Sequence, residues 1–141
     1  MSKHRWLPTV LRARQAQEDL AAQQVAAARR DVERAAGQLV AQQSRVAGLS
    51  LPATASVAEF QAEVAGQQAA LASLAAAGNR VQFADARLAG QLNQLTEAAK
   101  SRRTVEKMQE RIENTEARQA LLVAQREQDD VTIARHVRAA G

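Results

Sequence analysis

Apolar residues in the first third of the chain recur at alternating spacings of three and four. One row consists of Val25, Val32, Leu39 and Val46, and the row interleaved with it consists of Ala21, Ala28, Ala35, Gln42 and Leu49. This is the spacing of a helix that packs along a coiled-coil seam. The pattern predicts a helix over about residues 7–49, with Pro8 in its first turn, where no N–H donor is needed. The phase slips near Val10 and Leu20, where we expect a stutter.

The segment SLPATAS, residues 50–56, interrupts the pattern. Pro52 disfavours helical geometry at Leu51. Thr54 or Ser56 can cap a following helix, and Ser56 and Glu59 have the spacing of a capping box. A short connection between helices makes them antiparallel neighbours. We therefore expect a hairpin turn over residues 50–56.

A second helix is predicted over about residues 57–137, and it has a seam of its own. The expected seam positions are Val57, Phe60, Val64, Gln67, Leu71, Leu74, Gly78, Val81, Asp85, Leu88, Leu92, Leu95 and Ala99. Folding back at the turn would place Val46 near Phe60 and Val32 near Leu74, and the start of the first helix near residue 100. Residues from roughly 103 to 137 would then have no partner within the chain.

The expected fold is all-α: one long antiparallel two-helix coiled coil, a hairpin spanning residues 1–141, with an overhanging C-terminal helix. Composition favours this over a globule. Aromatic residues make up 2% of the 141 residues, and most of the apolar residues are alanine. Such a chain is poor in the large side chains that offset chain entropy in a globular core.

The expected overhang carries a sparse apolar row within dense mixed charge. The row consists of Val105, Met108, Ile112, Leu122, Ile133 and Val137. The Arg102–Glu106 and Arg126–Asp130 pairs have a spacing that supports a helix. An isolated helix with so weak a stripe frays unless something covers it. Two interpretations stay open: a partly disordered tail, or a helix offered to a partner protein or a second copy.

Basic residues gather at the expected open end of the hairpin. They are Lys3, Arg5, Arg12, Arg14, Lys100, Arg102 and Arg103. Like charges held close together repel unless an anionic surface meets them. An acidic partner, phospholipid headgroups or nucleic acid would serve, and a merely solvated basic end is equally compatible with the sequence.

The sequence gives little support for catalysis. It contains no cysteine, and His4 and His136 lack metal-ligand spacing with each other. A glycine-rich phosphate loop is absent. We expect no catalytic residue, metal or cofactor, and we expect the protein not to be an enzyme. Since no apolar run is long enough to span a membrane, a cytoplasmic protein is expected.

Two segments resemble a known family. The opening WLPTVLRARQAQEDLAAQQVAAARRDVERAAGQL has an aromatic residue, a leucine-bearing turn and an acidic pair before an alanine-rich helix, at Trp6, Leu11, Glu18 and Asp19. The end VEKMQERIENTEARQALLVAQREQDDVTIARH has an acidic pair followed by small apolar residues, at Asp129, Asp130, Val131 and Ala134. Both segments resemble the FliJ family of flagellar type III export proteins. The middle departs from it, with leucine, valine and glutamine where some members have tyrosine.

The resemblance implies a hairpin similar to the central stalk subunit of rotary ATPases. Such a protein is a stalk or coupling protein and general chaperone, without a small-molecule substrate, between the export ATPase ring and the export gate. It is expected in the cytoplasm and peripherally at the inner-membrane export apparatus, where it would also meet export chaperones and the cytoplasmic domain of the gate.

Positions for these contacts follow from the resemblance. The gate contact would fall near the hairpin tip, at Gln38, Gln42, Leu49, Phe60 and Val64. The ATPase contact would use the open end and the overhang, at Arg5, Arg12, Arg14, Lys100, Arg102, Arg103, Met108 and Ile112. Phe60 is the strongest candidate at the tip, although packing on Val46 in the seam would explain it equally well.

Other functions remain alternatives. The equivalent stalk protein of a virulence type III secretion system is barely separable by sequence. A nucleic-acid-binding coiled coil is disfavoured, because no basic stripe with interleaved aromatics is present. An amphipathic membrane-surface protein is disfavoured because the stripe lacks aromatic anchors. No nucleic-acid partner is expected, and self-association through the thin seam is left open.

Overall fold

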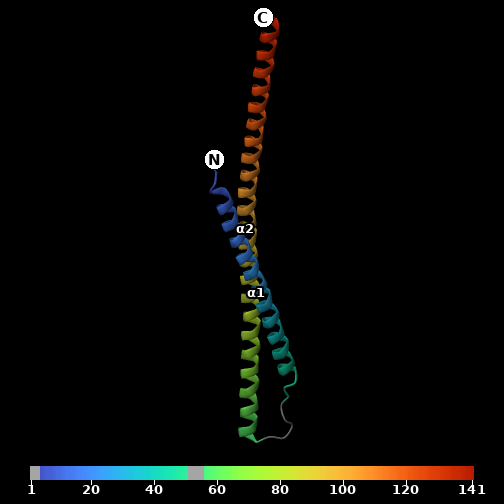
Figure 1. Ribbon diagram of the computed structural model, residues 1–141. Helices are drawn as coiled ribbons and strands as arrows, with labels where there is room; N and C mark the ends of the chain where they lie inside the picture. The colour runs from blue at the N-terminus through green and yellow to red at the C-terminus, as the bar shows by residue number, and fades with distance from the viewer. Residues whose placement is uncertain (1–3, 51–55) are drawn as a thin grey trace. The chain divides into compact units, whose positions relative to one another are not determined.

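The protein consists of two long helices. The structure, a computed structural model, describes residues 4–50 and 56–141. Helix α1 spans Leu7–Ala47 and helix α2 spans Val57–Ala140, and no strand occurs within the described ranges (Figure 1). The fold is therefore all-α, with two helices packed against each other, as predicted. Most of the expected turn, including Pro52 and Thr54, lies outside the described residues.

The ends of both helices are set by local hydrogen bonds. The Leu7 N–H donates to the His4 carbonyl oxygen at 3.1 Å before α1 begins. At the start of α2, the Glu59 N–H donates to Ser56 Oγ at 3.2 Å, and the Ser56 N–H donates to Glu59 Oε2 at 3.4 Å. These two bonds form the expected capping box, because each side chain satisfies a backbone donor left unpaired in the first turn.

The chain forms two compact units. The central unit comprises residues 16–98, and the terminal unit comprises residues 1–15 and 99–141. Each unit pairs a part of α1 with a part of α2 (Figure 1).

Alanine side chains form the seam of the central unit. The buried residues there are Ala21, Val25, Ala28 and Ala35 on α1, and Ala70, Ala77 and Ala84 on α2. Most of them recur every seven residues, and Ala77 is fully buried. Small side chains at these positions let two helix backbones approach closely.

The predicted seam is correct on α1 except at Leu49, which is exposed and follows the helix, and it is wrong in one row on α2. The structure buries Ala70, Ala77 and Ala84, whereas Leu71 is 53% exposed and Asp85 is exposed. The buried row of alanines and the predicted row through Leu71 each stand three or four residues from Leu74. Either row therefore completes a heptad pattern with Leu74. The row with the smaller side chains faces α1 because the helices lie close together.

The expected stutter in α1 is also wrong. Arg14 and Glu18 are half-buried and continue the spacing of three and four from Leu11 to Ala21. Leu20 is exposed, so it does not belong to the packed face. The seam therefore continues without a stutter through the polar residues Arg14 and Glu18. A search for apolar periodicity does not detect seam positions that are polar.

The two helices of the central unit are antiparallel, but their register differs from the prediction. Ala35 lines one groove together with Ala84, with Arg34 and Gln38 on α1 and Phe83 on α2. The expected pairing would have put Leu71 beside Ala35. The register is thus shifted by about 13 residues, nearly two heptads.

The shifted register leaves the first turns of α2 beyond the last turn of α1 (Figure 1). Counting eleven steps back from the Ala35–Ala84 level places Val46 at the level of Ser73, next to Leu74, rather than at Phe60. Phe60 is 47% exposed and Val57 is more exposed still. The predicted packing of Phe60 on Val46 is therefore not part of this seam.

In the terminal unit, the start of α1 packs against α2. Leu7 is only 2% exposed, and it lines a pocket with Pro8, Gln109 and Ile112. The expected neighbour was residue 100. Every residue from Glu113 to Ala140 is exposed, so the overhang begins about ten residues later than predicted and measures roughly 40 Å.

Candidate partner-binding surfaces

The five residues expected at the tip fall into two groups in the central unit. Phe60 and Val64 lie beyond the last turn of α1, and Leu49, which follows α1, is exposed. Gln38 instead lines the groove that contains Phe83. Along α2, Phe83 lies roughly 35 Å from Phe60. The structure therefore does not bring Gln38 together with Phe60.

Gln42 is a seam residue. Its side chain is half-buried, and its Oε1 atom is buried without a hydrogen-bond partner among the described residues. A buried amide in this position helps to fix register more than it offers a surface to a partner. The tip surface thus consists of Val57, Phe60 and Leu49, which are all exposed apolar side chains.

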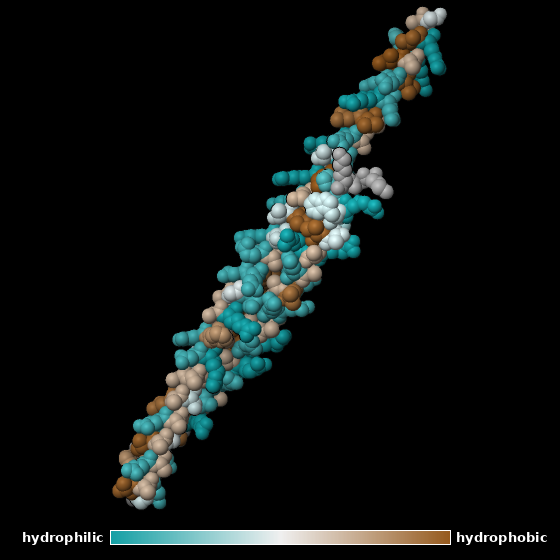
Figure 2. Space-filling view, turned by 90° about the vertical axis from the view of Figure 1, so that its left-hand side faces the viewer, coloured by the Kyte–Doolittle hydropathy of each residue, from teal (hydrophilic) through white to brown (hydrophobic). Residues whose placement is uncertain are grey.

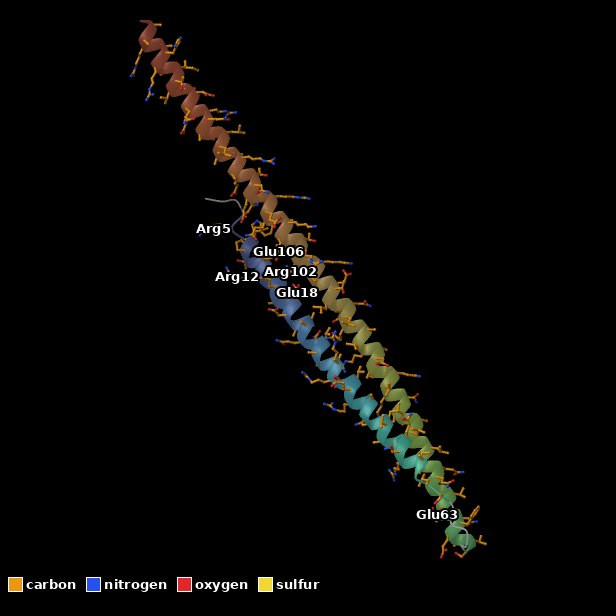
Figure 3. The ribbon with its side chains drawn as sticks, turned by 90° about the vertical axis from the view of Figure 1, so that its right-hand side faces the viewer. Arg5, Arg12, Glu18, Glu63, Arg102 and Glu106 are labelled. Carbon is orange, nitrogen blue, oxygen red and sulfur yellow. The ribbon has the colours of Figure 1, made fainter. Side chains whose placement is uncertain are left out.

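The eight residues expected to contact the ATPase all lie in the terminal unit. Arg5, Arg12, Lys100 and Arg103 are exposed, and Arg14 and Arg102 are half-buried. Because Leu7 lies beside Ile112, equal steps place Arg12 and Arg14 near residues 105–107 of α2. Figure 3 labels Arg5 and Arg12 on α1 and Arg102 on α2 within this unit, with Arg5 nearest the start of α1. Lys3 lies outside the described residues.

An ion pair neutralises one of these charges. Arg102 Nη1 lies 2.7 Å from Glu106 Oε1, and both side chains are partly buried (Figure 3). This is the first of the two expected helix-supporting pairs. Arg102 therefore serves α2 locally, while Arg12 and Arg103 remain exposed to solvent.

The two apolar residues of this set have different environments. Ile112 is half-buried in the pocket that holds Leu7, so it packs α1 onto α2. Met108 is 42% exposed and lines a shallow groove with Thr104, Lys107 and Arg111. Of the two, Met108 is the side chain that a partner could cover without unpacking the unit.

Sequence analysis missed one surface, a groove around Phe83. The Phe83 side chain is 71% exposed and lies on α2 between Arg80 and Arg87, at helical spacings of three and four. The groove has a volume of about 210 Å³. Arg34 on its α1 side pairs with Asp31 at 3.4 Å. An aromatic residue off the seam and flanked by two arginines was the signal that could have found it.

The described residues show two further absences. They contain no group of three or more His, Cys, Asp or Glu side chains that could hold a metal ion. Within the same residues, no helix is apolar enough over sufficient length to cross a membrane.

Comparison with protein families identifies the chain. The family model described as the Flagellar FliJ protein matches residues 3–141. The chain belongs to the FliJ family. No curated protein and no solved structure matches it. The expected resemblance is confirmed over both helices and both units.

Membership in the FliJ family makes the chain a component of flagellar type III protein export. The family is a non-catalytic part of that apparatus. The surfaces described above lie within the part of the chain that the family model covers.

Proposed function

We propose that this FliJ-family protein is a stalk-like coupling protein between the export ATPase ring and the cytoplasmic domain of the export gate. The observation that carries the proposal is the exposed end of α2. From Glu113 to Ala140 every residue is exposed, and beyond the pocket that ends at Glu116 the helix carries charged side chains of both signs around scattered apolar ones. A single helix is narrow enough to enter a ring, and mixed charge gives contacts weak enough for turnover.

In this proposal the terminal unit contacts the ATPase. The contact uses the overhang together with Arg12, Arg103 and Met108, which are exposed beside it. The exposed apolar tip of the central unit, at Val57 and Phe60, contacts the export gate. An exposed aromatic residue beside aliphatic side chains is the composition of an interface hot spot.

The proposal includes a chaperone role and a location. Export chaperones would bind transiently to exposed charged surface, as the family assignment suggests. The protein would work at the cytoplasmic side of the inner membrane, held there by the gate and the ATPase.

One experiment tests both contacts. The purified chain is captured on the export ATPase or on the gate's cytoplasmic domain, and compared with three variants. The first ends after Ala117, which keeps Ile112 and the Leu7 pocket intact, unlike a truncation at Lys100. The other two are Phe60→Ala and Phe83→Ala, which remove the chain's two phenylalanines, both substantially exposed.

The truncation should abolish ATPase binding and leave gate binding unchanged. Phe60→Ala should weaken gate binding about tenfold or more and leave ATPase binding unchanged, because truncating a hot-spot aromatic costs roughly 2 kcal/mol. Phe83→Ala is the matched control and should change neither. The coupling role is wrong if the truncated chain binds the ATPase as well as the full chain does. The tip assignment is wrong if Phe83→Ala rather than Phe60→Ala weakens gate binding.

A further inference from the structure

The packed face of α2 continues in phase through the overhang. In the terminal unit, the half-buried positions Arg102, Val105, Gln109 and Ile112 keep alternating spacings of four and three. The same spacing, extended beyond Ile112, reaches Glu116, Gln119, Val123, Arg126, Asp130, Ile133, Val137 and Ala140. All eight are exposed. Glu116 still lines the pocket that holds Leu7, and the positions from Gln119 onward continue the seam beyond the pocket, with Arg126 and Asp130 near its centre.

This seam is complementary to itself. The seam positions form two alternating rows, one containing Val123 and Asp130 and the other containing Arg126 and Ile133. In an antiparallel pair of helices, each position of one row faces a position of the other row on the partner helix. A two-fold axis at Gln128 makes Val123 face Ile133 of a second copy, and makes Arg126 face Asp130 of that copy. In the next layers outward, Gln119 faces Val137 of the second copy. Each contact occurs twice, as a two-fold interface requires.

Charge selects this arrangement over the parallel one. A parallel, in-register pair would stack Arg126 on its own copy and Asp130 on its own copy, which brings like charges together in adjacent layers. The antiparallel pair replaces both repulsions with opposite-charge contacts. Polar pairs at seam positions fix both register and orientation in coiled coils.

The two charged groups are available for such a contact. Arg126 and Asp130 have the spacing that supports a pair within one helix. Unlike Arg102 and Glu106, however, they form no ion pair with any described residue. The upper end of the molecule in Figure 2 shows hydrophobic patches alternating with hydrophilic ones along these turns. Among the apolar side chains of the overhang, Leu122, Val123, Ile133 and Val137 are each more than half exposed.

We propose that two copies of this chain pair antiparallel through residues 119–137, with Arg126–Asp130 contacts in the two central layers. The partner is a second copy of the chain. The inference goes beyond the coupling role, and it has a consequence for that role. Pairing covers the helix that the ATPase would bind, so a given overhang engages either its own copy or the ATPase.

The flanks of the seam keep this pairing weak. Glu127 and Asp129 lie on either side of the central layers, close to their own counterparts across the two-fold axis. Their like charges oppose the pairing. The variant Asp129→Asn should therefore lower the dimer dissociation constant. If Asp129 instead made an attractive contact, the same substitution would raise that constant.

The test measures association of the full chain by sedimentation equilibrium over a range of concentrations. The wild-type chain should dimerise reversibly. Arg126→Asp and Asp130→Arg, each alone, should raise the dimer dissociation constant about tenfold or more, because each puts like charges face to face in both central layers. Arg118→Asp is the matched control: it reverses a charge on the same helix but off the seam, and dimerisation should persist.

Mixing the two single variants decides the question. Each alone lacks the helix-supporting pair within its own chain, and mixing cannot restore that pair. A heterodimer, however, sets two acidic groups of one chain against two basic groups of the other. An equimolar mixture should therefore dimerise about as well as the wild-type chain. The proposal is overturned if the wild-type chain stays monomeric throughout the concentration range. It is also overturned if the mixture associates no better than either variant, or if Arg118→Asp disrupts pairing equally.

Discussion

At the scale of single residues, small side chains rather than large ones define the seam of the central unit. Ala77 is fully buried, while Leu71 is half-exposed. Periodicity could not separate the two rows, because both stand at heptad spacing from Leu74. A preference for large apolar residues favoured the leucine row. The close approach of the helices favours the alanine row, and sequence alone does not report that distance.

Substitution at these two positions tests the difference. Ala77→Leu should lower the free energy of unfolding by about 1–3 kcal/mol, since no space is available for the larger side chain. Leu71→Ala should change it by no more than about 0.5 kcal/mol, because the side chain is largely in solvent. Urea unfolding followed by circular dichroism measures both. Ala72→Leu, at an exposed position, controls for helix propensity and should be nearly neutral.

If Leu71→Ala destabilised the chain more than Ala77→Leu, the assignment of the buried row would be wrong.

At the scale of the helices, the sequence predicted that two helices form and roughly where each begins and ends. It did not predict which residues of α1 lie beside which residues of α2. Ser56 and Glu59 formed the expected capping box, and α1 ends at Ala47, two residues before its predicted end. The register differed because a heptad seam repeats every seven residues. A helix of 41 residues can then slide along one of 84 in steps of one heptad and meet a similar seam each time.

Leu7 is the buried side chain in the first turn of α1. Leu7 is the most buried large residue, and it packs where Ile112 lines the same pocket. Leu7→Ala should cost about 2 kcal/mol, the low end for leucine truncation, because the site is near a helix end and can relax. Amide hydrogen exchange should show faster exchange in the first turns of α1.

Leu121→Ala is the matched control for Leu7→Ala. Leu121 is exposed on the overhang, off the seam, and its truncation should leave exchange in α1 unchanged. Equal effects of the two substitutions would contradict the packing of α1 described for the terminal unit.

At the scale of the whole molecule, the sequence revealed family and fold class, but it did not reveal how the binding residues are grouped. Arg12 and Arg103 lie in one unit, as expected, because charge clustering does not depend on fine register. Gln38 and Phe60, predicted to lie together at the tip, lie apart in the structure. Their predicted grouping depended on the register of the two helices, and the structure has a different register. Phe83 was missed because a seam analysis discards residues that lie off the seam.

The register of the central unit decides whether the tip surface exists, since it places Phe60 beyond the end of α1. The chain contains no cysteine, so any intramolecular disulfide must join the two introduced cysteines. A disulfide requires Cα atoms roughly 4.4–6.8 Å apart. Two double variants are compared under mild oxidation at low protein concentration: Ala35→Cys with Ala84→Cys, and Ala35→Cys with Leu71→Cys.

Intact mass and loss of free thiols report an intramolecular bond. The account predicts rapid, nearly complete disulfide formation for the pair at positions 35 and 84, and none for the pair at 35 and 71. Disulfide formation at 35 and 71 but not at 35 and 84 would contradict the shifted register and return Phe60 to the seam beside Val46.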